Sequence, residues 1–469
     1  MKHLKIGARI LVVIALLSSC NKDSDQTMDP SFEKYNIQAS KSQGKVADQY
    51  IVQFKSDKLS LLPAIGGKNS VERAFEQLQR LAGSEIVLLY TYTNTIHGVA
   101  VEATEEALSI IRESDLVASV ESNFFISLID GQELPEKHGK NPQKGYGSQG
   151  KGNGKGPDKP GNGGDGSDGG DGGDGGTDSG PGNGNGKGGG KGKDKEEPSP
   201  DPSDSTTTDT PDANQPSQFI PTGITRVGGA KTVSGKVAWI IDSGIDGDHP
   251  DLLVDKTRSA FFLSQSGENS WEDNNGHGTH IAGTIGAIDN SIGVVGVAAG
   301  ASVVAIKVLD GNGNGTVADV IAGIDYVVGT GNSGDVVNLS LAGPSSQILD
   351  DAVINAGAKG FYMVIAAGNY ADDVQKYSPA RAQGTNVYTI SAINGNDIYA
   401  AFSNYGNSVV YAAPGVNVTS TWLNGEYSSI SGTSMAAPHV AGLLISGGIL
   451  SKSAAINDPD TRPDPIAER

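Results

Sequence analysis

The sequence predicts an α/β protein, in which a three-layer domain with a mostly parallel sheet (residues 218–450) follows a small α+β domain (residues 48–129). Three observations lead to this prediction. The later region contains uninterrupted apolar runs, which are typical of strands buried on both faces of a parallel sheet. The earlier region alternates between strand-like and helix-like spacing of its apolar residues. Between the two regions lies a long stretch of glycine and polar residues that cannot form a core.

The composition argues against some classes of function. The chain has 469 residues, of which 66 are glycine and only 36% are hydrophobic, so part of it cannot bury enough apolar surface to offset its ordering entropy. Its formal net charge of -19 argues against nucleic acid as a partner, because binding phosphate groups requires clustered lysine and arginine. The single cysteine, Cys20, has no second cysteine in the chain with which to form a disulfide.

The first 20 residues resemble the signal peptide of a bacterial lipoprotein. A basic start is followed by the apolar run Ile10–Leu17, which is too short to span a bilayer of about 30 Å. The run ends in Leu17-Ser18-Ser19-Cys20, which resembles a lipobox, where the cysteine is acylated and becomes the new N-terminus. We therefore expect residues 1–20 to direct export, and Cys20 to anchor the chain to a membrane surface before processing. The alternative is an incidental cysteine beside an ordinary cleavage site.

The spacing of apolar residues in 48–129 predicts a ferredoxin-like domain. A first helix has apolar residues at helical spacing between Val71 and Leu81, and a second helix begins after Thr104, a plausible N-cap followed by two glutamates. The expected strands are Gln49–Phe54, Ile86–Tyr92, Gly98–Glu102 and Val117–Phe125. The resulting β-α-β-β-α-β order is that of ferredoxin-like domains.

From their composition, which is rich in glycine, aspartate and proline, residues 131–216 are expected to form a disordered linker. Glycine recurs at every third position from Gly163 to Gly175, but the intervening prolines of collagen are missing. Two interpretations remain open. The Asp-Gly triplets could bind calcium loosely, or the segment could be a charged spacer, which the composition favours.

The later domain is expected to contain parallel strands with helices between them. The apolar runs that indicate strands are Val237–Ile241, Val303–Ile306, Val336–Leu339 and Met363–Ala367, and the expected helices include Val317–Val328 and Ile348–Ala358. Residues 451–469 are polar and rich in proline toward their end, and we expect them to form a polar C-terminal tail.

In such sheets the functional groups usually lie at the carboxyl ends of strands, and three polar residues are candidates. Asp242 follows an apolar run, His277 lies between two glycines, and Ser434 precedes a small and apolar helix-like run. Each has a common structural alternative. Asp242 and Ser434 could cap helix N-termini. His277 and His280 have the spacing of metal ligands, although no cysteine or nearby glutamate completes a usual zinc pattern.

These residues lie in three segments that together resemble the signature blocks of the subtilisin family, in the family's Asp, His, Ser order. The segments are Ile240–Ile245, His277–Gly283 and Gly432–His439. The similarity extends over most of residues 218–450. It implies a serine endopeptidase that acts on proteins or peptides through an acyl-enzyme intermediate, with Asp242, His277 and Ser434 as its catalytic triad.

The chemistry of these residue types agrees with the resemblance. A serine hydroxyl is a poor nucleophile at neutral pH, so it needs an imidazole to take its proton, and a carboxylate to hold that imidazole in the right tautomer. The oxyanion of the tetrahedral intermediate needs preorganised donors. Asn369, at the end of Ala366-Ala367-Gly368-Asn369, resembles the family's oxyanion asparagine, and the backbone N–H of Ser434 is the expected second donor.

The resemblance also implies a substrate-binding cleft. The segment Ser340-Leu341-Ala342-Gly343 resembles the family's substrate-pairing strand, and Gly313 and Gly315 resemble the opposing edge, so a peptide would lie between them as an added strand. Ala367 and Gly368 are further expected substrate-binding residues. Ala342 departs from the family's usual glycine, and its methyl group is expected to narrow the pocket for the side chain before the scissile bond.

A structural calcium ion is the expected cofactor. The segment Asp289–Val294 looks like the family's calcium loop, and Gln218 and Asp251 match its two outlying ligands. By this similarity, the ligands are the side chains of Gln218, Asp251 and Asn290 and the carbonyls of Ile288, Ile292 and Val294, which are the hard oxygen donors that calcium prefers. An ordinary glycine-containing surface loop is the alternative.

By the same resemblance, residues 48–129 are an inhibitor-type propeptide that assists folding and blocks the active site until it is cleaved. One departure from the family is that residues 131–216 separate it from the peptidase domain. Two other classes of function remain open: an inactive binding protein with the same fold, and a surface scaffold. The complete triad favours the endopeptidase, because a binding module would not need a full set of proton-transfer groups.

Overall fold

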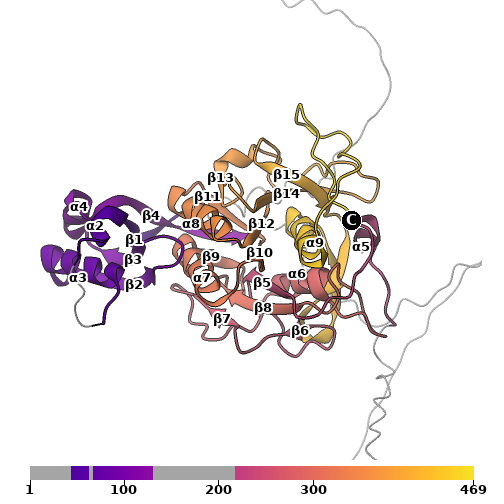
Figure 1. Ribbon diagram of the computed structural model, residues 1–469, viewed down its shortest axis with the longest axis horizontal. Coiled ribbons are helices and arrows are strands. Elements are labelled where there is room, and N and C mark those ends of the chain that lie inside the picture. Colours follow the sequence, from indigo (N-terminus) through magenta and orange to yellow (C-terminus); the bar gives the residue numbers. More distant parts are fainter. Residues whose placement is uncertain (1–43, 63–66, 130–216) are drawn as a thin grey trace, which may run out of the picture. The chain divides into compact units, whose positions relative to one another are not determined.

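A computed structural model of the protein describes residues 44–62, 67–129 and 217–469 (Figure 1). The expected signal peptide with Cys20 and the expected linker at 131–216 lie outside these residues. Among the helices of the described ranges, none is long and apolar enough to cross a membrane.

The N-terminal domain has the ferredoxin-like order that the sequence predicts, with one additional short helix. Its strands are β1 (Lys45–Phe54), β2 (Ile86–Tyr92), β3 (Gly98–Ala103) and β4 (Val117–Leu128), and its helices are α2 (Ser56–Leu59), α3 (Ser70–Ala82) and α4 (Glu105–Glu113). The strands pair antiparallel in the order β4-β1-β3-β2. As expected, Thr104 caps α4, because its side chain accepts the Ala107 N–H.

The C-terminal domain is built on a parallel sheet in the order β15-β14-β12-β10-β5-β8-β6. Its strands are β5 (Val237–Asp242), β6 (Leu253–Val254), β7 (Ala260–Phe261), β8 (Ser302–Lys307), β10 (Val336–Leu339), β12 (Tyr362–Ala366), β14 (Val387–Ile393) and β15 (Val409–Pro414). Shorter strands outside this sheet are β9 (Asn314–Thr316), β11 (Leu341–Pro344), β13 (Tyr377–Ser378), β16 (Val418–Thr421) and β17 (Tyr427–Ile430). The helices are α5 (Thr222–Arg226), α6 (His277–Gly286), α7 (Val317–Thr330), α8 (Gln347–Ala358) and α9 (Thr433–Ser446).

Helices cover both faces of this sheet, which confirms the predicted three-layer α/β fold (Figure 1). Helices α7 and α8 pack on one face with Trp239 and Ile241, whereas α6 and α9 pack on the other with Ala238 and Ile240. Alternate side chains of one strand therefore enter two separate cores. This is why the sequence of β5 is an apolar run without polar alternation.

The polar segment after α9 packs against the C-terminal domain, which its sequence did not indicate. Ile466 and Ala467 are fully buried, and isolated bridges join Ala412 to Ile466 and Leu450 to Glu468. A few apolar residues spaced among prolines and aspartates leave no periodic pattern in the sequence, yet they pack at the edge of the sheet beside β15.

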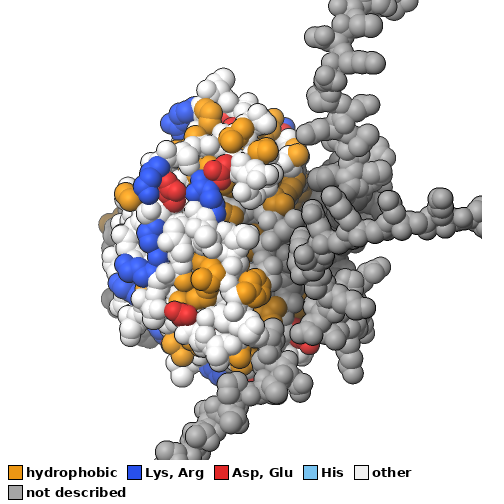
Figure 2. Space-filling view, turned by 90° about the vertical axis from the view of Figure 1, so that its right-hand side faces the viewer, with side chains coloured by type: hydrophobic (Ala, Val, Ile, Leu, Met, Phe, Trp, Pro, Cys, Tyr) orange, Lys and Arg blue, Asp and Glu red, His pale blue; other side chains and the backbone are white. Residues whose placement is uncertain are grey.

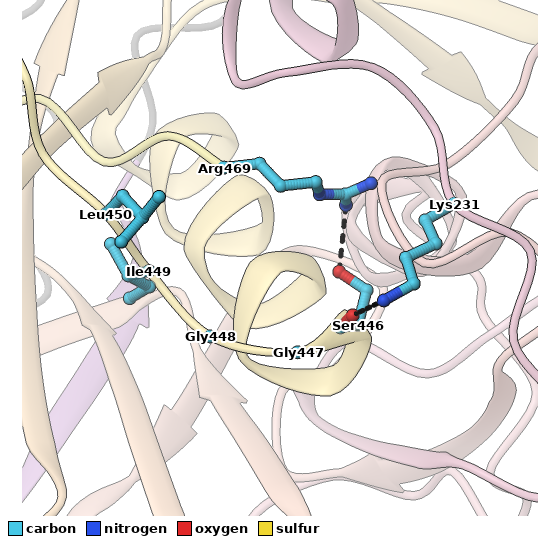
Figure 3. A pocket seen from close by; sticks show the side chains of 7 residues that line it. All are labelled: Lys231, Ser446, Gly447, Gly448, Ile449, Leu450 and Arg469. Carbon is cyan, nitrogen blue, oxygen red and sulfur yellow. Dashed lines mark hydrogen bonds between the residues drawn. The ribbon is translucent and has the colours of Figure 1, made fainter.

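Two positively charged side chains bind the C-terminal end of α9. Lys231 Nζ donates to the Ser446 carbonyl at 2.5 Å, and Arg469 donates to the Ser446 hydroxyl at 2.8 Å (Figure 3). Positive groups at a helix C-terminus satisfy its last carbonyl groups and its dipole. Figure 2 views the molecule from the side of this C-terminal end, where apolar, charged and uncharged side chains are mixed.

Asp464 makes this C-terminal segment sensitive to pH. Its carboxylate is buried and accepts the Ser391 hydroxyl at 2.7 Å, and burial raises its pKa to about 7, with Asp458 and Asp460 acting in the same direction. The unfolded chain has a carboxyl pKa of about 3.9. Between these values the folded state holds a proton that the unfolded state has lost, so stability falls as pH rises from about 4 to about 7.

We expect Asp464→Asn to stabilise the protein at pH 8 by on the order of 1–3 kcal/mol and to have little effect at pH 4, because the amide keeps a neutral partner for Ser391. Thermal unfolding at both pH values, in chains carrying Ser434→Ala to prevent self-digestion, measures this. Asp248→Asn, an exposed carboxylate change, is the control. An equal effect of Asp464→Asn at both pH values would contradict the prediction.

Candidate active site

Asp242 and His277 form a buried pair. Asp242 is the last residue of β5, and His277 is the first residue of α6. Gly276, the N-cap, has a φ of 106°, a conformation that glycine adopts without strain. His277 Nδ1 lies 2.8 Å from Asp242 Oδ1, and both side chains are fully buried. A proton on Nδ1 is therefore held by the carboxylate, which makes Nε2 the ring nitrogen that can take a proton.

Ser434 lies at the start of the helix that packs beside α6. It is the second residue of α9, and Gly432 occupies the N-cap position, so Ser434 is not the cap that its sequence context also allowed. Asp242 is likewise not an N-cap, because it ends a strand. The Ser434 hydroxyl donates to the carbonyl of Ile129 at 3.3 Å and to that of Ser340 at 3.5 Å. The hydroxyl therefore contacts a peptide carbonyl of the N-terminal domain.

Asn369 contacts the same carbonyl. It lies in the loop after β12, and its side-chain N–H donates to Ile129 O at 2.7 Å. The orientation of the amide is set from its other end, because Asn369 Oδ1 accepts both the backbone N–H and the hydroxyl of Thr433 at 2.9 Å. Thr433 is a positioning residue that sequence reasoning missed, although it directly precedes the serine of the motif.

The cleft beside these residues holds the end of β4 as an added strand. On one side β4 pairs antiparallel with β11, where Leu341 faces Leu128 and Ala342 faces Ser127. On the other side it pairs with β9, where Gly315 faces Ile126. The two expected edges of the cleft therefore lie on either side of one extended segment, as in strand addition.

Three of the expected glycines have different contacts: Gly313 and Gly343 lie against β4, and Gly368 bonds Thr433. The Gly313 carbonyl accepts the Leu128 N–H at 3.0 Å. A Cβ at Gly343 would lie 3.1 Å from Ile126 Cγ1, so the glycine allows close approach of the strand. Gly368 N–H donates to the Thr433 hydroxyl. Neighbouring Ala367 donates through its N–H to the Ile390 carbonyl of β14 at 3.0 Å.

His280 does not join His277 in a metal site. Its Nε2 lies 2.9 Å from the Val418 carbonyl, and burial lowers its pKa to about 3. Within the described ranges, no group of three or more histidine, cysteine, aspartate or glutamate side chains could hold a metal ion. The alternative reading of the two histidines as metal ligands is therefore not supported by their geometry.

The six expected calcium ligands lie together. Gln218 Nε2 donates to the carbonyls of Ile288 and Val294, at 2.9 and 3.3 Å. Asp251 accepts the Asn290 side-chain N–H at 2.8 Å and the Val294 N–H at 3.0 Å. Ile292 lies in the same loop, where its N–H donates to Asn290 Oδ1. Burial raises the pKa of Asp251 to about 6.

Two helix N-termini of the C-terminal domain are capped by side chains of β4. Glu121 accepts the Ser346 hydroxyl at 2.7 Å and the Ile348 N–H at 3.1 Å at the start of α8. Asn123 accepts the Ala318 N–H at 3.0 Å at the start of α7. Anionic and carbonyl oxygens satisfy the free N–H groups of a helix start. These contacts hold the two domains together, and no local sequence pattern indicates them.

Asp325 of α7 binds a loop of the N-terminal domain. Its carboxylate accepts the backbone N–H groups of Thr93, Asn94 and Thr95 at 3.0, 2.7 and 2.7 Å, and also the side chains of Thr95 and Asn94. One buried carboxylate therefore receives five hydrogen bonds from a single turn of the other domain. Hydrogen bonds to a charged group are stronger than neutral ones.

Comparison with known families matches both domains. Residues 234–446 match the Subtilase family, and residues 49–128 match Peptidase inhibitor I9. The chain is 44% identical over 234 residues to the thermostable alkaline protease of Halalkalibacterium halodurans, a match that covers 48% of this chain and 62% of that relative.

Other relatives are matched over more of their length. The chain is 41% identical to Proteinase T of Parengyodontium album and 44% identical to Subtilisin Savinase of Lederbergia lenta, each match covering 48% of this chain and, respectively, 74% and 83% of the relative. Among solved structures, a cold adapted subtilisin-like serine proteinase is 36% identical, with a TM-score of 0.42, and the match covers 50% of this chain and 88% of that one.

Proposed function

We propose that this chain, which belongs to the subtilase family of serine endopeptidases and carries an inhibitor-type propeptide, is exported as a lipid-anchored zymogen that hydrolyses peptide bonds after its propeptide is cleaved. One observation carries the catalytic part of the proposal. The carbonyl of Ile129 accepts hydrogen bonds from both the Ser434 hydroxyl and the Asn369 amide, while Asp242 holds the ring of His277.

The geometry supports acyl transfer by these side chains. The Ser434 hydroxyl attacks the carbonyl carbon of the scissile bond, and His277 takes its proton and passes it to the leaving amine. Asp242 stabilises the imidazolium that forms. Asn369 donates to the oxygen on which negative charge develops, so its hydrogen bond strengthens in the transition state. Water then releases the acyl group and restores the serine.

The contacts of β4 support the proposal that the chain is made as an inactive zymogen. The strand fills the cleft between β9 and β11, so a substrate cannot add its own strand there while the propeptide is bound. The role of the propeptide as a folding aid is supported by its caps on α7 and α8, because they stabilise helices that flank a slow-forming parallel sheet.

Labelling with a fluorophosphonate probe tests the catalytic proposal. We expect the processed enzyme to be labelled at Ser434, and Ser434→Ala to abolish both labelling and peptide hydrolysis. The matched control is Ser429→Ala, an exposed serine five residues earlier, which should be labelled like the parent. Failure of the processed parent to react would favour the inactive binding protein or the scaffold.

The lipid anchor is supported by the targeting pattern that ends in Cys20. We expect mass spectrometry of the unprocessed chain from a bacterial host to show an acylated N-terminal Cys20. Cys20→Ser should move the chain from the membrane to the soluble fraction. An unmodified mature start downstream of Cys20 would refute the anchor.

A structural calcium ion is also proposed, at the site formed by Gln218, Asp251 and the loop around Asn290. The donors fit such an ion, because the amide NH2 of Gln218 already lies between the Ile288 and Val294 carbonyls, and rotation of the amide would present its oxygen instead. When bound, the ion would hold the loop to the segment that begins the peptidase domain.

Chelation is expected to lower the melting temperature of the Ser434→Ala chain by about 5–10 °C relative to saturating calcium, because a bound ion stabilises only the folded state. Asp251→Asn should remove most of this calcium-dependent shift. Asp289→Asn changes an exposed carboxylate of the same loop and should retain it. A melting temperature that does not respond to chelation would support an ordinary surface loop.

A further inference from the structure

We propose that the processed enzyme also binds its substrates at the starts of α8 and α7, and that it prefers extended protein segments with acidic or amide side chains where Glu121 and Asn123 now lie. The proposal deepens the proposed function and rests on it, because it needs a peptidase that is active once the propeptide has left. The ligand class is an extended, acidic stretch of a protein substrate.

The start of α8 forms a subsite for a carboxylate. Glu121 Oε2 accepts the Ser346 hydroxyl at 2.7 Å and Glu121 Oε1 accepts the Ile348 N–H at 3.1 Å, so each carboxylate oxygen has a donor from the peptidase domain. Ser346 is only 1% exposed, and its backbone N–H donates to Ser378 Oγ at 2.9 Å, which fixes its position. The positive end of the helix dipole adds to these two donors. This subsite loses its ligand when the propeptide leaves.

The charges beside the α8 subsite leave it favourable for an anion. Asp350 is the acidic residue in the first turn of α8, and its carboxylate forms an ion pair with Arg381. Burial raises the pKa of Asp350 to about 6, and Glu121 acts in the same direction. The paired charges of Asp350 and Arg381 largely cancel, so the two donors and the helix dipole decide which ligand binds.

The start of α7 forms a second subsite, for a side-chain oxygen. The capping box of Thr316 and Asp319 satisfies the backbone N–H of Asp319. The N–H of Ala318, which is fully buried, donates instead to Asn123 Oδ1 at 3.0 Å. A buried donor without an acceptor is costly, so this N–H favours a substrate that supplies an oxygen in place of Asn123.

Strand β4 joins the two subsites to the cleft. Its ladder with β9 extends back to Phe125, which faces Thr316, and Asn123 and Glu121 follow at alternate positions of the same strand. Alternate residues of a strand point to the same side, so these side chains reach the helix starts together. At about 3.3 Å per residue, the distance along the strand from Ile129 back to Glu121 is about 26 Å. A substrate that adds to the same two edges must be extended over this length to contact both subsites.

The expected consequence is a specificity that depends on substrate length. A short peptide can pair with β9 and β11 but reaches neither helix start, whereas an extended acidic segment reaches both. Contacts this far from the reacting carbonyl are equal in the bound substrate and in the transition state, so they should lower KM and leave kcat unchanged.

Chromogenic peptides test the preference on the enzyme that the full-length chain yields after processing. The parent peptide has the sequence of residues 119–129 with a p-nitroanilide at its carboxyl end. We expect Glu121→Gln in this peptide to raise KM by about three- to tenfold, and Asn123→Ala by about threefold, with kcat unchanged. The matched control is Ser122→Ala, which removes a hydroxyl that has no hydrogen bond among the described residues and should keep the parent's KM.

A variant of the enzyme assigns the effect to α8. Ser346→Asp keeps an oxygen that can cap the helix but places a carboxylate where Glu121 binds, so the ratio of KM between the Glu121→Gln peptide and the parent peptide should fall to one or below. Ser333→Asp adds the same charge at an exposed position after the end of α7 and should keep the ratio of the unmodified enzyme.

Two outcomes separate this proposal from the proposed function. An enzyme that hydrolyses the p-nitroanilide of residues 126–129, but has the same KM for the parent and Glu121→Gln peptides, would overturn the α8 subsite, and an equal KM for the Asn123→Ala peptide would overturn the α7 subsite. Absence of hydrolysis of every peptide, together with absence of fluorophosphonate labelling, would instead refute the proposed function.

Discussion

Asn369→Ala is expected to lower kcat of the processed enzyme by about 10²–10³-fold and to leave KM nearly unchanged. The reason is that its side-chain N–H reaches the carbonyl oxygen on which charge develops, so the hydrogen bond contributes more in the transition state than in the bound substrate. This range of effects is established for a member of the same family. Steady-state kinetics on a peptide substrate, with active sites counted by titration, measures it.

Thr433→Val is a second variant at the same site, with a smaller expected effect on kcat. It removes the hydroxyl that donates to Asn369 Oδ1 but keeps the backbone N–H that does the same. We expect a fall in kcat of roughly tenfold or less, since one net hydrogen bond is worth about 1 kcal/mol. Asn417→Ala, on an exposed turn, is the control. An unchanged kcat in Asn369→Ala, or a loss confined to KM, would remove Asn369 from the oxyanion site.

Asp325→Ala is expected to lower the affinity of the cleaved propeptide for the peptidase by more than about 30-fold. The variant removes the carboxylate that accepts five hydrogen bonds. The backbone N–H groups of Thr93, Asn94 and Thr95 then lose their acceptor. Truncating one side of such a buried charged contact costs about 2–5 kcal/mol. The lag before activity appears, when the processed complex is diluted, should shorten in proportion to the faster dissociation.

The control for this variant is Asp351→Ala on α8, whose carboxylate bonds only Gln347 among the described contacts and should give the parent's lag. The kcat of fully activated enzyme should be the same in the parent and both variants, because the described contacts of the Asp325 carboxylate are with residues 93–95 of the propeptide and not with the triad. A lag that does not change in Asp325→Ala would show that the ladders and helix caps of β4 carry the inhibition alone.

The local sequence was enough to predict the fold class, and it named Asp242 and His277, which the structure pairs, and Ser434 and Asn369, which contact one carbonyl. The apolar run of β5 indicates a strand buried on both faces, and the segments around Asp242, His277 and Ser434 are short motifs in which neighbours along the chain define the environment. The expected positions of β2 and β10 agree with the structure residue for residue. The lipid anchor, the calcium ion and the linker stay predictions.

Only the tertiary structure decided which propeptide carbonyl lies at Ser434, which carboxylate holds the propeptide, and how the C-terminal segment packs. Ile129 and Asn369 are 240 residues apart, and Asp325 and Thr95 are 230 apart. Contacts of this kind depend on strand register and on the meeting of distant surfaces, so they leave no periodic or local pattern. The sequence by itself therefore determined the chemistry that this protein carries, and the folded chain determined which carbonyl of its own propeptide contacts Ser434 and Asn369.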